Sequence, residues 1–417
     1  MYRRGWSKVH SSLFWIVVLA FAVRLGYILI GHTYRFKPIE DNFGFGFEMG
    51  RVGRSLALGQ GFSNPFHGIT GATAWEPPLY PLLIAGVFKL FGIYTHASAL
   101  VLLSINSLFS ALTCIPIFLI AKRCFSEKLA VWSAWTWALF PSIIFWCTRW
   151  VWETSLAALL LTLIFWLALV MEEKDGLAPW LEFGLLWGLA ALTNTSLLSF
   201  LPASAVWVWY RRAKGGKRSF GGIVLAATVF AACITPWLIR NYRTFGQFVF
   251  IRSNFGAELR LGNGPGANGT WMEDLHPTKN VAQLRLYRQM GEIAYVAERK
   301  REAVAFIRED YSRFAGLCGK RFLYYWAGPP RSGDSILAHL PNGLFLTSSV
   351  LAFWGVGRAI RHRKPGAWLF LWLILFYPFV YYVTFPHPRY RHPIEPELGI
   401  LMLYIISEAE PSRRRSH

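Results

Sequence analysis

The sequence predicts an all-α polytopic membrane protein with about ten transmembrane helices. Its 417 residues are 54% hydrophobic and 17% aromatic but only 16% charged, and the mean hydropathy is +0.34. This composition is typical of membrane-embedded chains and outside the range of ordinary soluble domains. Apolar runs of about 20 residues, the length that crosses a bilayer, recur along the chain. Short clusters of Lys and Arg lie between these runs.

The apolar runs define the predicted spans. They are residues 12–31, 98–121, 129–148, 151–171, 179–195, 196–210, 220–239, 343–361, 366–385 and 394–408. The first run resembles a signal peptide, but no small-residue cleavage site follows it, so we expect a retained anchor. The run 78–93 is short and contains Lys89, so we expect it to lie at the interface. Residues 179–210 are few for two full spans, and a broken hairpin is the alternative.

The net charge of +20 does not indicate a nucleic-acid partner, because the basic residues form no single face or arm. They fall into five clusters, at residues 3–8, 122–128, 211–218, 358–364 and 413–415. Such clusters mark the cytoplasmic side of membrane proteins. The chain is therefore expected in a bacterial inner or plasma membrane, with both termini cytoplasmic.

This topology leaves residues 32–97 and 240–342 on the outer side. We expect three parts: a transmembrane module at 1–239 that includes the first outer loop, an outer cap at 240–342, and C-terminal spans with a basic tail at 343–417. The cap has a helical pattern over 281–325. In the first outer loop, an amphipathic helix over 44–58 is expected to lay its apolar residues on the bilayer: Phe47, Val52, Leu56 and Leu58.

Three carboxylates lie close to predicted membrane edges. Glu40 and Asp41 open the stretch "EDNFGFGFEMGR", and Glu76 stands in "TAWEPPLYPLL", where prolines interrupt the helix. An isolated acid in such a loop is usually a solvated charge. Acids from two parts of one loop can instead converge above the bilayer, which makes all three candidate catalytic residues.

Several stretches resemble C-type glycosyltransferases (GT-C), the superfamily of the protein O-mannosyltransferases and the lipid A aminoarabinose transferases. "GRSLALGQGFSNPF" and "EPPLYPLLIAGVFKLFG" are similar to the first outer loop of these enzymes. "TPWLIRNYRTFGQF" followed by "LGNGPGANG" resembles bacterial members, and "HPRYRHPIEPELGILMLYI" resembles their last outer loop and final helix. The resemblance implies a GT-C-like bundle with outer-side juxtamembrane helices and a small loop-and-helix cap.

The resemblance also implies a reaction. A sugar would move from a polyprenyl-phosphate-linked donor to an acceptor hydroxyl on the outer face, with inversion and with an Asp as general base. The acid early in the first loop corresponds to Asp41, with Glu40 beside it, and the second acid to Glu76. The lipid A enzymes commonly carry a lysine after the second acid, where this chain has Pro77. The acceptor, whether a glycan, a lipid or a protein, is not identified.

Expulsion of an anionic phosphate requires cations. Arg389 and Arg391 in "PRYR" are the predicted phosphate ligands, because guanidinium groups match phosphate oxygens. In an extended segment, alternation across Tyr390 would point both arginines the same way. The alternative is a pair of interfacial arginines that face lipid headgroups. Arg54 and Arg240 are weaker substrate-binding candidates, and Arg240 can equally mark the end of a span.

No cofactor is predicted, although a divalent cation stays open. His387 and His392 could join acidic ligands, but their spacing specifies no metal site. The alternative functions are a membrane transporter or lipid flippase and a noncatalytic scaffold of the cell envelope. A transporter is expected to carry charges within its spans and a repeated half. Arg24 is the one clear mid-span charge, and no repeat is visible.

Overall fold

The protein is helical throughout the part that the structure describes. The computed structural model describes residues 2–36, 43–330 and 336–409, which contain no β-strand. The first half comprises α1 (Tyr2–Ile30), η1 (Phe43–Phe45), α2 (Glu48–Ala57), α3 (Leu79–Phe91), α4 (His96–Leu112), α5 (Cys114–Cys124), α6 (Glu127–Leu139), α7 (Pro141–Arg149), α8 (Thr154–Val170) and α9 (Ala178–Thr193). The predicted all-α class is confirmed.

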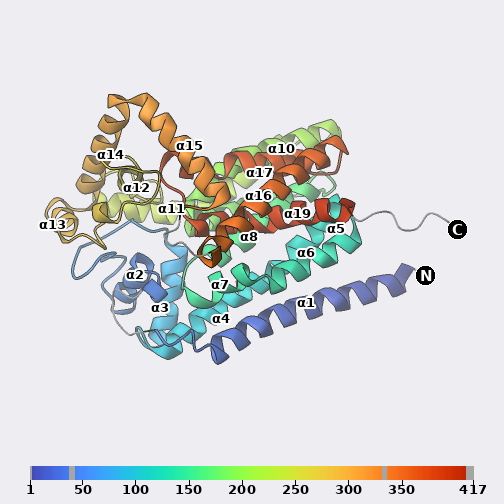
Figure 1. Ribbon diagram of the computed structural model, residues 1–417, viewed down its shortest axis with the longest axis horizontal. Coiled ribbons are helices and arrows are strands. Elements are labelled where there is room, and N and C mark those ends of the chain that lie inside the picture. Colours follow the sequence, from blue (N-terminus) through green and yellow to red (C-terminus); the bar gives the residue numbers. More distant parts are fainter. Residues whose placement is uncertain (1, 37–42, 331–335, 410–417) are drawn as a thin grey trace.

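The second half forms the outer cap and the remaining helices of the bundle (Figure 1). It comprises η2 (Thr195–Phe200), α10 (Leu201–Lys214), α11 (Phe220–Phe245), α12 (Phe255–Gly262), η3 (Glu273–Leu275), α13 (Val281–Met290), α14 (Glu292–Glu309), α15 (Tyr311–Ala327), α16 (Ile336–Arg361), α17 (Ala367–Phe376), α18 (Phe379–Val383), η4 (Pro388–Ile394) and α19 (Glu395–Ala409).

Every predicted span coincides with one helix or with two consecutive helices. By length and apolarity, four described segments can cross a membrane: Ser12–Ile30, His96–Cys124, Phe220–Phe245 and Leu340–Arg361. The pair α6 and α7, bent by 46°, qualifies as a fifth. These segments support a multi-pass membrane protein, while the number of ten spans stays a prediction. Residues 179–210 are interrupted at Asn194, between α9 and η2.

Helix α3 corresponds to the short run that the sequence places at the interface. Its 13 residues extend about 20 Å at about 1.5 Å per residue, less than the roughly 30 Å of a hydrocarbon core. Buried side chains from α3 share a hydrophobic cluster with α2 and α4. Its length therefore agrees with an interfacial helix.

Three of the five basic clusters, at residues 122–128, 211–218 and 358–364, lie at one end of the bundle. Arg123 and Arg211 both pair with Glu172, at 3.3 and 2.5 Å, although they lie in different clusters. Arg358 pairs with Glu408, near the end of α19, at 3.1 Å. In Figure 1, α2, α3 and the cap helices α12–α14 lie at the opposite end. The fold thus separates these three basic clusters from the segments that are predicted to lie on the outer side.

The bend between α6 and α7 is stabilised by Arg24, the mid-span charge on α1. Pro141 has no backbone N–H, so it cannot donate to the carbonyl of Trp137 one turn earlier. The fully buried Arg24 guanidinium donates to the carbonyls of Trp137 (3.0 Å) and Ala138 (2.7 Å), and to Ser110 Oγ (3.2 Å). Arg24 therefore replaces the hydrogen bond that the proline removes at Trp137 and also supplies a donor to the next carbonyl, that of Ala138.

Replacement of Arg24 by Met should destabilise the protein strongly. Each buried carbonyl left without a donor costs about 1–3 kcal/mol, and Arg24 serves two at the bend. We expect a lower melting temperature in detergent. The matched control is Arg149→Met on α7, because Arg149 is exposed and contacts α1 through the Tyr27 side chain. Equal melting temperatures for the two variants would contradict this role of Arg24.

One expectation about the first outer loop is wrong. Helix α2 forms where the amphipathic pattern predicted it, but it packs against the protein: Val52 is fully buried, and Met49 is buried in a cluster with residues of α3 and α4. Leu58, at the end of the helix, is exposed. The apolar face of α2 therefore covers α3, and the bilayer is not its main partner.

The helical pattern of the cap is confirmed, as three helices. Gly291, with φ of 75°, separates α13 from α14 in a conformation that favours glycine. Asp310 begins α15 by accepting a hydrogen bond from the backbone N–H of Arg313 at 2.8 Å. These breaks fold the cap back over the first outer loop.

Candidate active site

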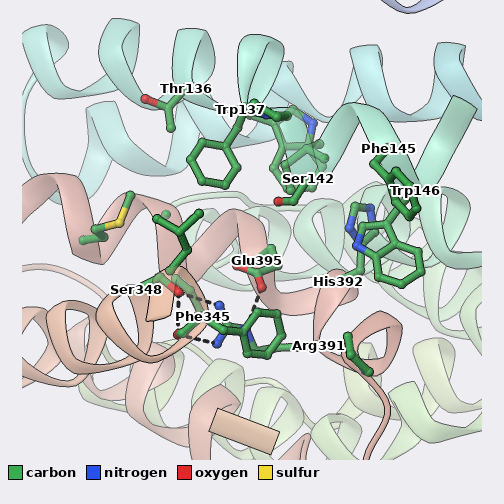
Figure 2. Close-up of a pocket in the computed structure, with 18 of the residues that line it drawn as sticks. Thr136, Trp137, Ser142, Phe145, Trp146, Phe345, Ser348, Arg391, His392 and Glu395 are labelled. Carbon is green, nitrogen blue, oxygen red and sulfur yellow. Dashed lines mark hydrogen bonds and ion pairs between the residues drawn. The ribbon is translucent and has the colours of Figure 1, made fainter. Parts of the chain in front are cut away.

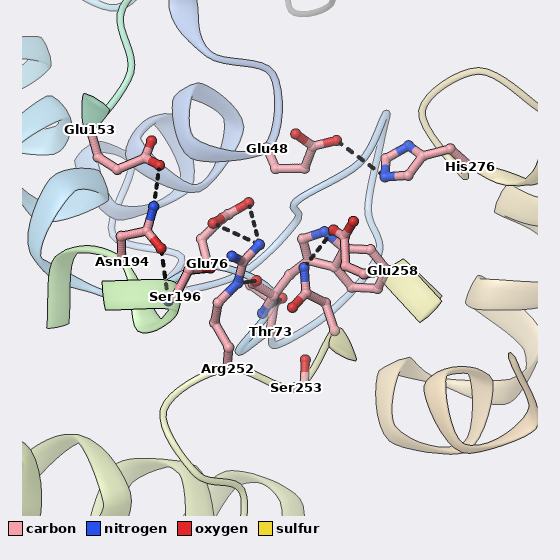
Figure 3. Close-up of polar contacts among 12 residues, drawn as sticks. Glu48, Thr73, Glu76, Glu153, Asn194, Ser196, Arg252, Ser253, Glu258 and His276 are labelled. Atoms are coloured by element: carbon pink, nitrogen blue, oxygen red, sulfur yellow. Dashed lines mark hydrogen bonds and ion pairs between the residues drawn. The ribbon is translucent and has the colours of Figure 1, made fainter. Parts of the chain in front are cut away.

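The first outer loop, the cap and the last outer loop enclose a cavity of about 680 Å³, here called the outer cavity. Its charged lining comes from five separate parts of the chain and is listed here: Glu48, Glu76, Glu153, Arg252, Glu258, Glu273, His276, Lys279, His387 and Arg389. Figure 3 shows how several of these side chains converge. Such a concave site with convergent polar groups is a candidate active site.

Glu76 and Arg252 form the central ion pair of the outer cavity. Arg252 Nη2 lies 3.3 Å from Glu76 Oε2, and Arg252 Nε donates to the Trp75 carbonyl at 2.9 Å. Burial raises the pKa of Glu76 to about 8, although Arg252 opposes this shift. A carboxyl with this pKa is mostly protonated at neutral pH, where Glu76 contacts Arg252 as a neutral acid and can donate a hydrogen bond; the pair becomes fully ionic as the pH rises through about 8.

Glu153 lies at the start of α8 and faces the same cavity. Its Oε1 accepts from Asn194 Nδ2 at 3.1 Å, while its buried Oε2 has no hydrogen-bond partner within the described ranges. A buried acceptor without a partner is unusual in proteins. Glu153 is therefore available to accept a hydrogen bond from a bound molecule.

Two further carboxylates complete the acidic side. Glu48 accepts from the Thr278 hydroxyl at 2.7 Å, and His276 Nε2 lies 3.8 Å away. Burial lowers the pKa of His276, which favours its neutral form. Glu258 accepts from Asn254 Nδ2 at 2.9 Å, and burial raises its pKa.

Arg389 and Tyr390 bring the last outer loop into the outer cavity. The Arg389 guanidinium carbon lies 3.7 Å from the centre of the Trp152 ring, which orients it by a cation–π contact. Burial opposes its charge, but Tyr390, Glu153 and Glu76 outweigh burial and raise the pKa of Arg389. A permanent cation thus faces the carboxylates.

Arg391 lies in a different cavity, and the extended conformation expected for "PRYR" is wrong. Residues Pro388–Ile394 form the 3₁₀-helix η4. With about three residues per turn, residues two apart do not share a face. Arg391 therefore lines a second cavity of about 540 Å³ between α6, α7, α16 and α19 (Figure 2).

The Arg391 guanidinium is bound by protein groups. It donates to Glu395 Oε1 (2.6 Å), Ser349 Oγ (2.7 Å) and Ser348 Oγ (2.6 Å), and it stacks on Phe345. These bonds use most of its donors. The geometry therefore favours a structural role for Arg391, and only Arg389 keeps the geometry of a phosphate ligand.

The remaining predicted site residues lie elsewhere. Glu40 and Asp41 fall outside the described residues, although Phe47 and Glu48, shortly after them, line the outer cavity. Arg54 on α2 is half-buried and does not line that cavity. Arg240 donates to the carbonyls of Thr73 (2.6 Å) and Phe62 (2.7 Å), so it holds the backbone of the first outer loop.

The sequence interpretation missed Glu153 and Arg252. Glu153 follows Arg149 at the spacing of a helix-surface pair, but α7 ends at Arg149 and α8 begins at Thr154, so the two share no helix. Arg149 binds Tyr27 instead. Arg252 meets Glu76 across 176 residues, a distance at which local pattern gives no signal.

The two histidines considered as metal ligands do not meet: His387 lines the outer cavity and His392 the second cavity. Over residues 2–36, 43–330 and 336–409, no group of three His, Cys, Asp or Glu side chains has the arrangement of a metal site.

Comparisons with known proteins agree with this architecture. The family model described as dolichyl-phosphate-mannose-protein mannosyltransferase matches residues 75–239, which is less than half of the chain. No curated protein sequence matches the chain. Several solved structures do match along nearly its whole length.

The apo oligosaccharyltransferase of Archaeoglobus fulgidus superposes with a TM-score of 0.56 and 14% identity, over 95% of this chain and 50% of that one. The same archaeal enzyme, AglB, in complex with an inhibitory peptide and a dolichol-phosphate superposes with a TM-score of 0.51 and 13% identity, over 100% of this chain and 53% of that one. ArnT from Cupriavidus metallidurans, bound to undecaprenyl phosphate, superposes with a TM-score of 0.49 and 15% identity, over 95% of this chain and 60% of that one. The chain spans between half and three-fifths of the length of these structures. As the sequence resemblance predicted, this chain has the fold of the C-type glycosyltransferase superfamily.

Proposed function

We propose that the protein is an integral-membrane glycosyltransferase. It transfers a sugar from a polyprenyl-phosphate-linked donor to an acceptor hydroxyl on the outer face of the membrane. The observation that carries this proposal is the outer cavity, where the carboxylates Glu76 and Glu153 face the cation Arg389. The family description names dolichyl-phosphate-mannose, and a solved neighbour holds dolichol-phosphate; both are polyprenyl phosphates, which supports this donor class.

The reaction assigns a role to each side of the cavity. The acceptor oxygen forms a bond to the anomeric carbon from the face opposite the phosphate, the bond between that carbon and the phosphate oxygen breaks, and the sugar inverts. Asp41 takes the proton of the acceptor hydroxyl as general base. The polyprenyl phosphate leaves with its charge compensated by Arg389. Glu76, protonated at neutral pH, donates a hydrogen bond to the sugar, with Tyr390 beside it.

A transfer assay tests this function. The purified protein is incubated with radiolabelled sugars on polyprenyl phosphate and with a membrane extract that supplies glycan, lipid and protein acceptors. Label should leave the donor lipid and appear in one acceptor class. Parallel reactions with EDTA test the divalent cation that the sequence leaves open. Donor lipid that crosses a liposome membrane without any sugar transfer would support the flippase alternative instead.

The orientation of the membrane protein has its own test. Because three of the basic clusters lie at one end of the bundle, we expect that end in the cytoplasm and the outer cavity on the opposite side. Reporter fusions after Gly68, in the first outer loop, and after Gly269, in the cap, should both report the outer side. A cytoplasmic signal at either position contradicts the topology.

A further inference from the structure

A buried carboxylate in the cap ties together the segments that carry the central ion pair. Glu292 is the first residue of α14, is 4% exposed and does not line the outer cavity. Its Oε1 accepts from the Ala74 backbone N–H at 2.6 Å and from Ser253 Oγ at 2.7 Å. Its Oε2 accepts from the Tyr287 hydroxyl at 2.7 Å and from the Thr73 hydroxyl. Both oxygens are thus fully used.

The donors to Glu292 adjoin both members of the Glu76–Arg252 pair. Ala74 stands two residues before Glu76, and Ser253 directly follows Arg252. The two segments also bond each other, since the Ser253 N–H donates to the Ala74 carbonyl at 2.9 Å. One carboxylate therefore anchors two segments that lie far apart in the sequence.

The ion pair depends on where these segments lie. Its contacts, 3.3 and 3.4 Å between Arg252 Nη2 and the Glu76 oxygens, are at the long end for a charged hydrogen bond. A small displacement of either backbone would separate the groups. Burial raises the pKa of Glu292, while the four hydrogen bonds that it accepts oppose this shift by favouring the ionised form. Hydrogen bonds to an ionised carboxylate are stronger than neutral ones, so ionised Glu292 is suited to hold both backbones.

We propose that Glu292 is a positioning residue of the outer cavity, which sets the distance between the Glu76 carboxyl and the Arg252 guanidinium by anchoring Ala74 and Ser253. This inference rests on the proposed function for its catalytic consequence. Its structural consequence is independent of any donor.

That consequence is a change in the proton affinity of Glu76. Burial and the facing carboxylates Glu48, Glu153 and Glu258 raise the pKa of Glu76 from 4.5 to about 8, and Arg252 is the main group that opposes this shift, with a smaller effect from Arg389. If Arg252 withdraws, the pKa of Glu76 rises further. Because the folded pKa exceeds the unfolded value, the stabilisation from protonated Glu76 is complete below pH 4.5 and is lost as pH rises through about 8.

Melting temperatures report this titration without a donor. They are measured between about pH 5 and about pH 10, a range that includes the loss of the proton. The wild type is compared with Glu76→Gln, and Glu292→Ala with the double variant. Within each pair, the difference in melting temperature changes at the pH at which Glu76 loses its proton. We expect this pH to be higher for the pair that carries Glu292→Ala than for the pair that carries wild-type Glu292. If this change occurs in the Glu292→Ala pair at the same pH as in the wild-type pair, or at a lower pH, the proposal is overturned.

A control on the same helix separates positioning from general support. Glu302 pairs with Arg260 and Arg299 at 2.8 Å each, away from the outer cavity. Glu302→Ala should lower the melting temperature but leave the pH dependence that Glu76 causes as in the wild type. If Glu292→Ala does not fold, Glu292→Gln carries the same comparison with a smaller shift, because its amide oxygen can still accept from the Ala74 N–H.

Transfer kinetics give the second readout. We expect Glu292→Ala to lower kcat by about tenfold or more per folded molecule, as small displacements in active sites do, and Glu292→Gln to fall between it and the wild type. Unchanged kcat in Glu292→Ala would overturn the positioning role. If the wild type transfers no sugar, the proposed function fails, while the melting comparison still decides whether Glu292 positions the pair.

Discussion

Replacement of Asp41 by Asn should lower sugar transfer by about 100- to 10,000-fold, the range that a general base contributes. The amide keeps the size of the carboxylate but cannot take the proton of the acceptor hydroxyl. The melting temperature and the amount of folded protein should stay at wild-type values. Initial rates with the donor identified in the transfer assay measure the effect.

Glu40→Gln is the matched control for Asp41→Asn, because it removes the neighbouring carboxylate. Its effect should be much milder. An essential Glu40 with a dispensable Asp41 would show that the base within the pair is assigned wrongly. Loss of transfer in Glu153→Gln with normal transfer in Asp41→Asn would instead move the base to α8, where Glu153 Oε2 faces the outer cavity without a partner in the described part of the chain.

Arg389→Lys should lower kcat/KM by about 10- to 100-fold, which corresponds to the roughly 1.5–3 kcal/mol of a charged hydrogen bond. Lysine keeps the charge but loses the planar fork that matches phosphate oxygens, and it stacks less well on Trp152. Because Arg389 makes few bonds to the protein scaffold, the melting temperature should change little. Kinetics with varied donor concentration, together with thermal melts, measure both effects.

Arg391→Lys is the matched control, with the opposite expectation. Its guanidinium holds Glu395, Ser348 and Ser349 together, so lysine should lower the melting temperature and leave the turnover of the folded protein close to wild type. A loss of turnover without a loss of stability in Arg391→Lys would place the donor phosphate in the second cavity. That outcome would restore the sequence-based assignment of both arginines.

The helices of the bundle and of the cap could be predicted because length, apolarity and helical period are local properties of a sequence. What each helix packs against could not be predicted from the sequence. The pattern of α2 indicates one apolar face but does not say whether a bilayer or a neighbouring helix covers it. Met49 on α2 is buried in a cluster with α3, a contact that only the tertiary structure reveals.

The site could be predicted in part for similar reasons. Glu76, Arg389 and Tyr390 belong to short stretches that resemble known outer loops, and all three line the outer cavity. The alternation argument failed for Arg391 because Pro388 and Pro393 lie in a 3₁₀-helix, whose period of about three replaces the period of two of an extended chain.

Arg252, Glu153 and Glu292 act through contacts between distant segments, and such contacts leave no local pattern. Glu76 meets Arg252 across 176 residues, and Ala74 meets Glu292 across 218. Their residue types are common on any charged loop. Only the fold shows that they converge on one cavity or on its supports.

A structure of the protein with an undecaprenyl-phosphate-linked sugar tests the central claim most directly. The proposal predicts the phosphate within hydrogen-bond distance of Arg389 and the sugar in the outer cavity beside Glu76, with the first outer loop next to its anomeric carbon. A phosphate bound in the second cavity beside Arg391, or a sugar that contacts none of the outer-cavity carboxylates, would contradict it.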